Sequence, residues 1–336
     1  PATAPNVVTP IEQDLGGGMS ALRMTSHGVS VRGRPLFLQA GTFHYFRLPH
    51  PDLWAPALTR IRLSGFNAVV IPFSWAYHSS APDFYDFTGP RNVDRLLDTV
   101  EDAGLWLIPH VGPWVGQGLD AGGIPAWVFR SAGPLPGCED TETVSLSYAL
   151  RRPLSAWWSH LLKALRGRDS VVFAMVDVGR CSDGSFPQAL LPAVIELFNE
   201  QAPDVPQAVL RQPGRPEPTA ASLGFIERDA ADLPDAPVPD EPGLTWLDVT
   251  VPAADRRSRF AIPRLHAGYP REAVASLVGR GCRAYALTPT HEGAAWGWWD
   301  APPRCQAPVR GAPVPVGWTP SPRSLNLRRL LLTTET

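Results

Sequence analysis

Lysine is nearly absent from this chain of 336 residues, since Lys163 is the only one, and basic residues do not exceed acidic ones. The 30 lysine and arginine residues are balanced by 32 aspartate and glutamate residues, which leaves a formal net charge of −2. Proteins that bind nucleic acid neutralise phosphates with an excess of positive charge. The sequence therefore argues against a nucleic-acid partner.

Long hydrophobic runs and metal-binding cysteine patterns are missing as well. No stretch reaches the roughly 18 consecutive apolar residues of a transmembrane helix, so no membrane span is predicted. The four cysteines lack both the CxxC spacing and the histidine spacing of zinc sites. We predict no metal site and no cofactor.

A signal peptide is not visible at the start of the sequence. The opening residues, PATAPNVVTP, include neither a basic region nor an apolar core. Residues 1–27 are therefore expected to be an N-terminal extension or tether. The compartment is unknown from the sequence, although a secreted or cell-surface location is favoured over a cytoplasmic one.

Short apolar segments alternate with amphipathic helical patterns along the rest of the chain. Eight candidate strands are predicted at residues 35–45, 66–76, 105–114, 170–179, 205–211, 243–252, 259–268 and 282–291. Continuous apolar strands separated by helices are typical of parallel strands buried on both faces, and eight of them predict a closed barrel. We therefore expect one α/β domain, a (β/α)8 TIM barrel over residues 28–336.

The weakest part of this pattern lies between the fifth and sixth predicted strands. Residues 212–242 are rich in proline and aspartate, so the helix expected there is degraded or replaced by a loop. Cys138 and Cys181 each follow a predicted strand by a short interval, and a disulfide between them is a candidate.

Four phrases of the sequence resemble one known family. They are GTFHYFRLPHPDLWAPALTRIRLSGFNAVVIPFSW (41–75), DFYDFTGPRNVDRLL (83–97), GPWVGQGLDAGGIPAW (112–127) and HEGAAWGWWDAPP (291–303). Together they resemble the catalytic barrel of glycoside hydrolase family 35, the family of many β-galactosidases. The resemblance implies a retaining glycosidase, in which a carboxylic acid and a carboxylate nucleophile lie about 5–5.5 Å apart.

The same resemblance implies that both catalytic carboxylates are gone. The family's acid/base residue ends the fourth strand, at the position of Gly179, and its nucleophile on the seventh strand corresponds to Arg264. Glycine has no side chain, and a guanidinium has no lone pair with which to attack a sugar. The family's sugar-contacting positions are likewise replaced, by Pro72, Ala76, Gly118, Val178, His266 and Leu287.

Several residues near the predicted strand ends are candidates for a residual pocket. They are His44, Trp75, Trp114, Asp120, Asp177, His266, Glu292, Trp296 and Asp300. Asp177 is expected to be a buried structural acid that pairs with Arg264, because an unpaired buried charge is costly. The tryptophans could stack on sugar rings, although packing is their expected role.

The predicted function is that of a catalytically retired glycoside hydrolase-like barrel, kept as a structural or interaction module. Its expected partners are other proteins of a larger assembly, or a glycan. Two alternatives stay open: an active glycoside hydrolase with relocated carboxylates, and a glycan-binding module that uses an aromatic rim.

Overall fold

The structure, a computed structural model, describes twelve stretches of the chain. They are residues 13–14, 22–25, 28–31, 33–116, 119–132, 148–179, 190–210, 223–229, 243–248, 269–288, 290–291 and 322–334.

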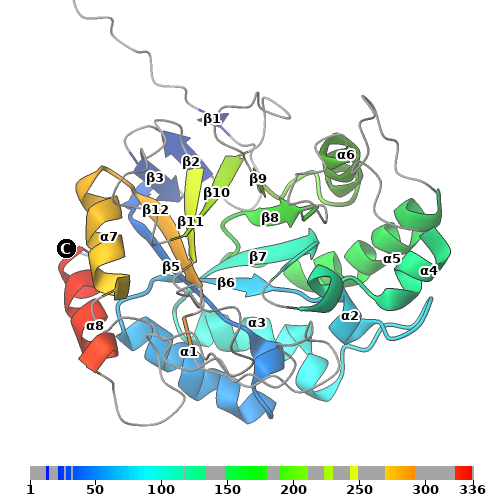
Figure 1. Cartoon of the computed structure of the whole chain (residues 1–336), viewed down its shortest axis with the longest axis horizontal. Helices are drawn as coiled ribbons and strands as arrows, with labels where there is room; N and C mark the ends of the chain where they lie inside the picture. The colour runs from blue at the N-terminus through cyan, green and yellow to red at the C-terminus, as the bar shows by residue number, and fades with distance from the viewer. Residues whose placement is uncertain are drawn as a thin grey trace, which may run out of the picture.

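Eight parallel strands form a closed ring in these residues, with every strand hydrogen-bonded to its two neighbours (Figure 1). In ring order they are β10 (Leu223–Asp229), β11 (Gly243–Asp248), β12 (Ala284–Thr288), β5 (Leu38–Thr42), β6 (Ala68–Pro72), β7 (Trp106–Pro113), β8 (Ala174–Asp177) and β9 (Gln207–Leu210).

Helices connect these strands and surround them. They are α1 (Trp54–Leu63), α2 (Trp75–His78), α3 (Val93–Asp102), α4 (Ala126–Ala132), α5 (Tyr148–Leu165), α6 (Leu191–Gln201), α7 (Tyr269–Gly279) and α8 (Pro322–Thr334). The described chain thus forms a parallel barrel surrounded by helices. Its complete eightfold alternation stays a prediction, because residues 211–222 and 230–242 lie outside the described residues.

The sixth and seventh barrel strands differ from those expected. Strand β10 lies within residues 212–242, where a degraded connection was predicted, and β11 pairs directly with β12 through Thr245 and Tyr285. In the described ring no strand lies between these two, and residues 259–268, for which a barrel strand was predicted, lie outside the described residues. The sequence of β10, LGFIERD, contains three charged residues, so it does not show the apolar pattern of a buried strand.

Two apolar layers follow from the alternation of side chains along the strands. Val69 and Ile71 point outward and pack with helix residues such as Leu97 and Trp157. The inward residues form a separate cluster inside the barrel, which includes Leu38, Ala40, Ala68, Val70, Ile108, Met175, Ala208, Ala284 and Ala286. Small residues dominate this cluster, as the narrow interior of an eight-stranded barrel requires.

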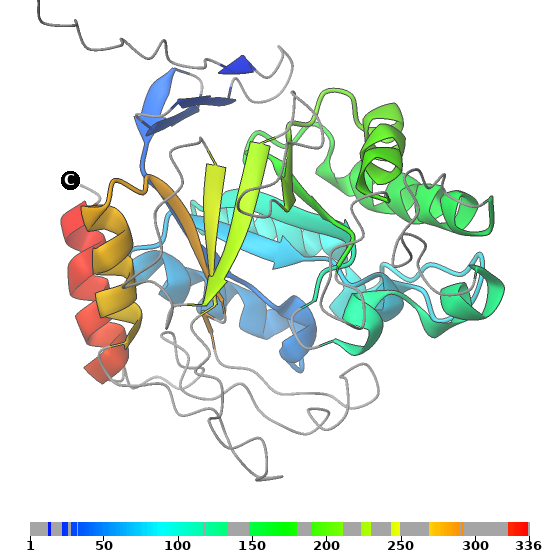
Figure 2. The same ribbon diagram turned by 45° about the horizontal axis from the view of Figure 1, so that its top comes forward.

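A four-stranded antiparallel sheet precedes the barrel (Figure 2). Its strands are β1 (Gln13–Asp14), β2 (Leu22–Thr25), β3 (Gly28–Val31) and β4 (Arg34–Leu36). Val31 and Leu36 pack against the inner cluster, which places this sheet at the amino-terminal end of the barrel strands. Strands β1 and β2 come from the segment 1–27 that was predicted to be an extension, and the domain boundary after residue 27 stays a prediction.

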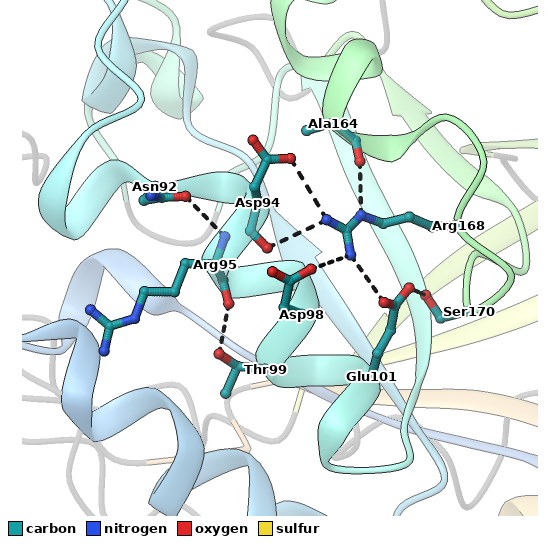
Figure 3. Close-up of polar contacts among 9 residues, drawn as sticks. All are labelled: Asn92, Asp94, Arg95, Asp98, Thr99, Glu101, Ala164, Arg168 and Ser170. Atoms are coloured by element: carbon teal, nitrogen blue, oxygen red, sulfur yellow. Dashed lines mark hydrogen bonds and ion pairs between the residues drawn. The ribbon is translucent and has the colours of Figure 1, made fainter.

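Charged residues hold α3 against the connection that leads into β8 (Figure 3). Asn92 caps α3 by accepting the backbone N–H of Arg95 at 2.9 Å. One Arg168 nitrogen lies 2.8 Å from Asp98 and 3.0 Å from Glu101, and its other terminal nitrogen lies 3.6 Å from Asp94. We call these four charged residues the Arg168 cluster.

Candidate functional site: the mouth of the barrel

Polar residues replace the apolar inner layer at the carboxyl ends of the barrel strands. Four polar residues lie there: Thr42, His110, Asp177 and Thr288. Each follows an inward-facing residue of the inner cluster by two positions, so it faces inward as well; those residues are Ala40, Ile108, Met175 and Ala286. The exposed fractions of the four polar residues are 0%, 3%, 8% and 5%, respectively. We call this set the mouth ring, and it lies where barrel enzymes carry their active sites.

Asp177 is the carboxylate of the mouth ring, and it is buried. Its Oδ1 accepts the backbone N–H of Gly179 at 2.8 Å, and its backbone oxygen accepts the N–H of Trp114 at 3.0 Å. The expectation of a buried acid thus fits the geometry. Its predicted partner, Arg264, lies outside the described residues.

The side chain of Trp114 occupies the space beside Gly179. A Cβ atom added to Gly179 would lie 2.4 Å from the indole Cδ2, and one added to Gly122 would lie 2.1 Å from the same atom. Real Cβ contacts are not this short, so the indole fits only because both residues are glycines. Gly179 also has φ +79°, in the left-handed region that favours glycine. The position that the family resemblance gives to the acid/base therefore has no room for a side chain while Trp114 is in place.

Hydrogen bonds join the end of β5 to the segment after β12. The backbone N–H of His44 donates to Nε2 of His291 at 2.9 Å, and that of Thr42 donates to the Thr290 hydroxyl at 2.8 Å. Both histidines are 2% exposed. These contacts make His44 part of the closure between the first and last barrel strands.

His110 is a buried histidine that stays neutral. Burial lowers its pKa to about 3, while a hydrogen bond with the backbone of Trp114 acts in the opposite direction. At neutral pH the mouth ring therefore contains an uncharged imidazole. A neutral imidazole is also the form that binds metals, but in the described part of the chain no group of three or more His, Cys, Asp or Glu residues is placed to hold an ion.

The structure brings together only some of the predicted site residues. Trp114, Asp177 and Gly179 lie together at the mouth, whereas Asp120 is exposed at the start of a 3-10 helix, Asp120–Gly123. Trp75 is fully buried and stacks on Trp157 with a centroid distance of 6.3 Å, so it belongs to the wall and not to a rim. The remaining predicted residues, His266, Glu292, Trp296, Asp300, Cys138 and Cys181, lie outside the described residues.

Thr42 and Thr288 were not among the predicted site residues. Each stands two positions beyond a small inward-facing alanine, so counting by twos along the strand could have found them. Hydroxyl groups at such positions carry no signal of their own, because threonine is common in strands.

Solved structures of glycosidases share this fold. The β-galactosidase from the psychrophilic Marinomonas ef1 matches 88% of this chain and 59% of its own, with a TM-score of 0.59 and 10% sequence identity. A GH5_18 protein from Streptomyces cattleya, in complex with GlcNAc, matches 89% of this chain and 81% of its own, with a TM-score of 0.60 and 13% identity. The protein therefore shares the barrel fold of these two structures.

Sequence similarity then narrows the class to a family. Residues 29–136 match the family model of glycosyl hydrolases family 35. A probable β-galactosidase C from Aspergillus flavus is 39% identical over 112 residues, which are 33% of this chain and 11% of that relative. This segment is thus similar to glycosyl hydrolase family 35, and the chain spans only a small part of the length of the curated relatives that it matches. The match includes β5, β6 and β7 but ends before Gly179.

Within the described residues, no helix combines the length and the apolar character needed to cross a membrane.

Proposed function

We propose that this barrel has lost glycoside hydrolysis at its mouth and serves as a structural or interaction module. The observation that carries the proposal is the packing of the Trp114 indole between Gly122 and Gly179. A retaining glycosidase needs a carboxylic acid as proton donor, and the family resemblance places that acid at the end of the fourth barrel strand. Here the donor's position has no side chain, and an aromatic ring fills the adjoining volume.

The size of the expected loss supports this proposal. General acid and base catalysis contributes about 10²–10⁴-fold to an enzymatic rate, and the loss of a nucleophile removes the covalent route as well. The replacement of the nucleophile by Arg264 rests on the family resemblance alone. Other proteins of a larger assembly, or a glycan, are the partners that we propose for such a module.

A second candidate function is glycoside hydrolysis by relocated carboxylates. It is favoured by the position of β11, which is the seventh strand of the barrel in chain order and ends at Asp248. The fourth strand, β8, ends at Asp177. Aspartates thus end the two strands on which the family places its acid/base and its nucleophile. In this candidate, Asp177 and Asp248 supply the two carboxyl groups.

Hydrolysis of a panel of nitrophenyl glycosides, galactoside included, separates the two candidates. The unchanged chain, Asp177→Asn, Asp248→Asn and a heat-treated sample are assayed side by side. We expect no turnover above the heat-treated sample. Turnover that both substitutions abolish would replace the first candidate with the second, and turnover that survives both substitutions would contradict both.

A further inference from the structure

The segment between α2 and α3 is closed by a pair of hydrogen bonds at His78. The backbone N–H of Asp86 donates to the backbone oxygen of His78 at 2.8 Å, and the His78 ring nitrogen Nδ1 lies 2.8 Å from the backbone oxygen of Asp86. A carbonyl oxygen can only accept, so Nδ1 carries the ring proton. We call this pair of contacts the His78 clamp, and it holds residues 79–92 against the barrel.

The other ring nitrogen of His78 is occupied too. Nε2 lies 2.6 Å from the hydroxyl of Tyr45, and both side chains belong to residues that are 1% exposed. With the proton on Nδ1, a neutral imidazole must accept at Nε2, so the Tyr45 hydroxyl donates. A second ring proton, on Nε2, would reverse this hydrogen bond, so that the Tyr45 hydroxyl accepts and its own proton loses Nε2 as an acceptor.

The surroundings of His78 disfavour a positively charged ring. The rings of Phe87, Tyr77 and Trp157 lie with centroids 4.8, 5.5 and 5.5 Å from the imidazole. Burial lowers the pKa of His78 to about 4. It also raises the pKa of Tyr45 well above its ordinary value, so the phenol stays protonated and cannot balance an imidazolium as a phenolate.

Two charged groups face the clamp, and both are already engaged. The Asp86 carboxylate accepts the backbone N–H and the hydroxyl of Thr88 at 2.9 and 2.7 Å, and it lies 3.3 Å from the Arg91 guanidinium. Burial has the largest effect on the pKa of His78 and lowers it; the charge of Arg91 also lowers it, whereas the backbone hydrogen bond and the carboxylate of Asp86 raise it. A protonated His78 therefore gains stable hydration only if the segment opens.

We propose that His78 is an acid-sensitive clamp that releases residues 79–92 from the barrel. Release would expose Phe87, which stacks on Trp157 with a centroid distance of 6.1 Å, and would add it to the exposed ring of Phe84. The inference goes beyond the proposed function, because the clamp works in the same way whether or not the mouth is catalytic.

Amide hydrogen exchange of the full chain at several pH values tests the clamp. The readout is the protection factor, because it corrects for the intrinsic pH dependence of exchange. Between about pH 6.5 and pH 4 the open segment takes up a proton that the closed one excludes, so protection of residues 79–92 should fall by up to about tenfold per pH unit. Strands β6 and β7 exchange through global unfolding, which also protonates His110, so their protection should fall more steeply with pH than that of the segment.

Two variants make the test specific. Glutamine can donate to the Asp86 oxygen and accept from Tyr45 without titrating, so His78→Gln should make protection of the segment independent of pH. His50→Gln removes a histidine whose side chain is 65% exposed and should behave like the unchanged chain. Protection that stays constant in the unchanged chain, or that falls equally in His78→Gln, would overturn the proposal.

A second measurement needs no variant. Exchange of the histidine C2 hydrogen, followed by mass spectrometry of the unchanged chain, reports the titration of His78 itself. A midpoint near the pKa of about 4 given above supports the clamp. A midpoint near 6.5, the ordinary value for histidine, would overturn it.

Discussion

The two ends of the barrel place their polar groups in opposite environments. At the mouth, Asp177 and His110 are buried. At the other end, the carboxylates of the Arg168 cluster remain in water, and the side chains of Asp94 and Asp98 are 74% and 64% exposed. The mouth therefore depends on close packing and internal hydrogen bonds, whereas the far end depends on charges that face water.

This difference explains how a mouth can lose a catalytic residue and stay folded. A catalytic carboxylate needs space and access for its substrate, but the fold needs only that polar groups find partners and that volume is filled. At Gly179 the ring of Trp114 fills the volume beside the glycine. The backbone N–H of Gly179 finds its partner in the carboxylate of Asp177. The barrel is thus compatible with the loss of its family's chemistry.

Acid should destabilise the fold mainly through its buried histidines. Burial lowers the pKa values of His110 and His78 to about 3 and about 4. Between pH 6.5 and pH 4 the unfolded chain therefore binds protons that the folded one excludes, so their stabilising contribution is complete above pH 6.5 and is lost as the pH falls. Two such groups cost about 4 kcal/mol of unfolding free energy between pH 7 and 5.

Urea unfolding at pH 7, 6 and 5 measures this loss. The substitution His110→Gln removes one of the two titrating groups and should halve the dependence on pH over this range. An unfolding free energy that stays level from pH 7 to 5 would show that the two buried histidines titrate normally.

Substitution of Gly179 should test the packing at the mouth. Gly179→Ala places a Cβ against the Trp114 ring in a left-handed conformation, and we expect a loss of about 2–4 kcal/mol. Gly167 has a similar φ of +77° with nothing within 4 Å of an added Cβ, so Gly167→Ala isolates the backbone contribution, about 1 kcal/mol. Thermal and urea unfolding compare the two variants.

A double-mutant cycle sharpens this comparison. Trp114→Ala removes the ring that Gly179→Ala would meet, so the two changes together should cost less than the sum of their separate effects, by about 0.5–3 kcal/mol. Equal losses in Gly179→Ala and Gly167→Ala, with additive effects in the cycle, would mean that the indole is not confined by Gly179.

The smallest effect is expected at the far end of the barrel. Arg168→Gln should cost about 1 kcal/mol at low salt, because the Arg168 side chain is 15% exposed but its carboxylate partners face water. Near 1 M salt the Debye length is only about 3 Å, so the difference should shrink. Arg95→Gln, in an exposed single pair with Asp52, is the control and should change less. A loss at Arg168 that does not depend on salt would contradict the contrast between the two ends.

Most of the barrel strands could be predicted from the sequence, because most of them are apolar runs. Strands β5, β6, β7, β8, β9 and β12 all lie within predicted ranges. Strand β10 was missed because its charged residues hide it, and β11 was assigned to the wrong place in the ring. The glycosidase resemblance was confirmed, whereas the loss of catalysis stays a proposal.

The sequence by itself determined the barrel type, the resemblance to glycosyl hydrolase family 35 and the glycine at position 179, because each depends on local composition or on motifs read in order along the chain. Only the tertiary structure decided that Trp114, Gly122 and Gly179 meet at one point, since they come from different segments whose contact depends on the pairing of β7 with β8. It also decided that Trp75 is buried in the core and does not lie on an exposed aromatic rim. The physical reason is that burial and strand order depend on how the ring closes, and no local pattern encodes which neighbours that closure brings together.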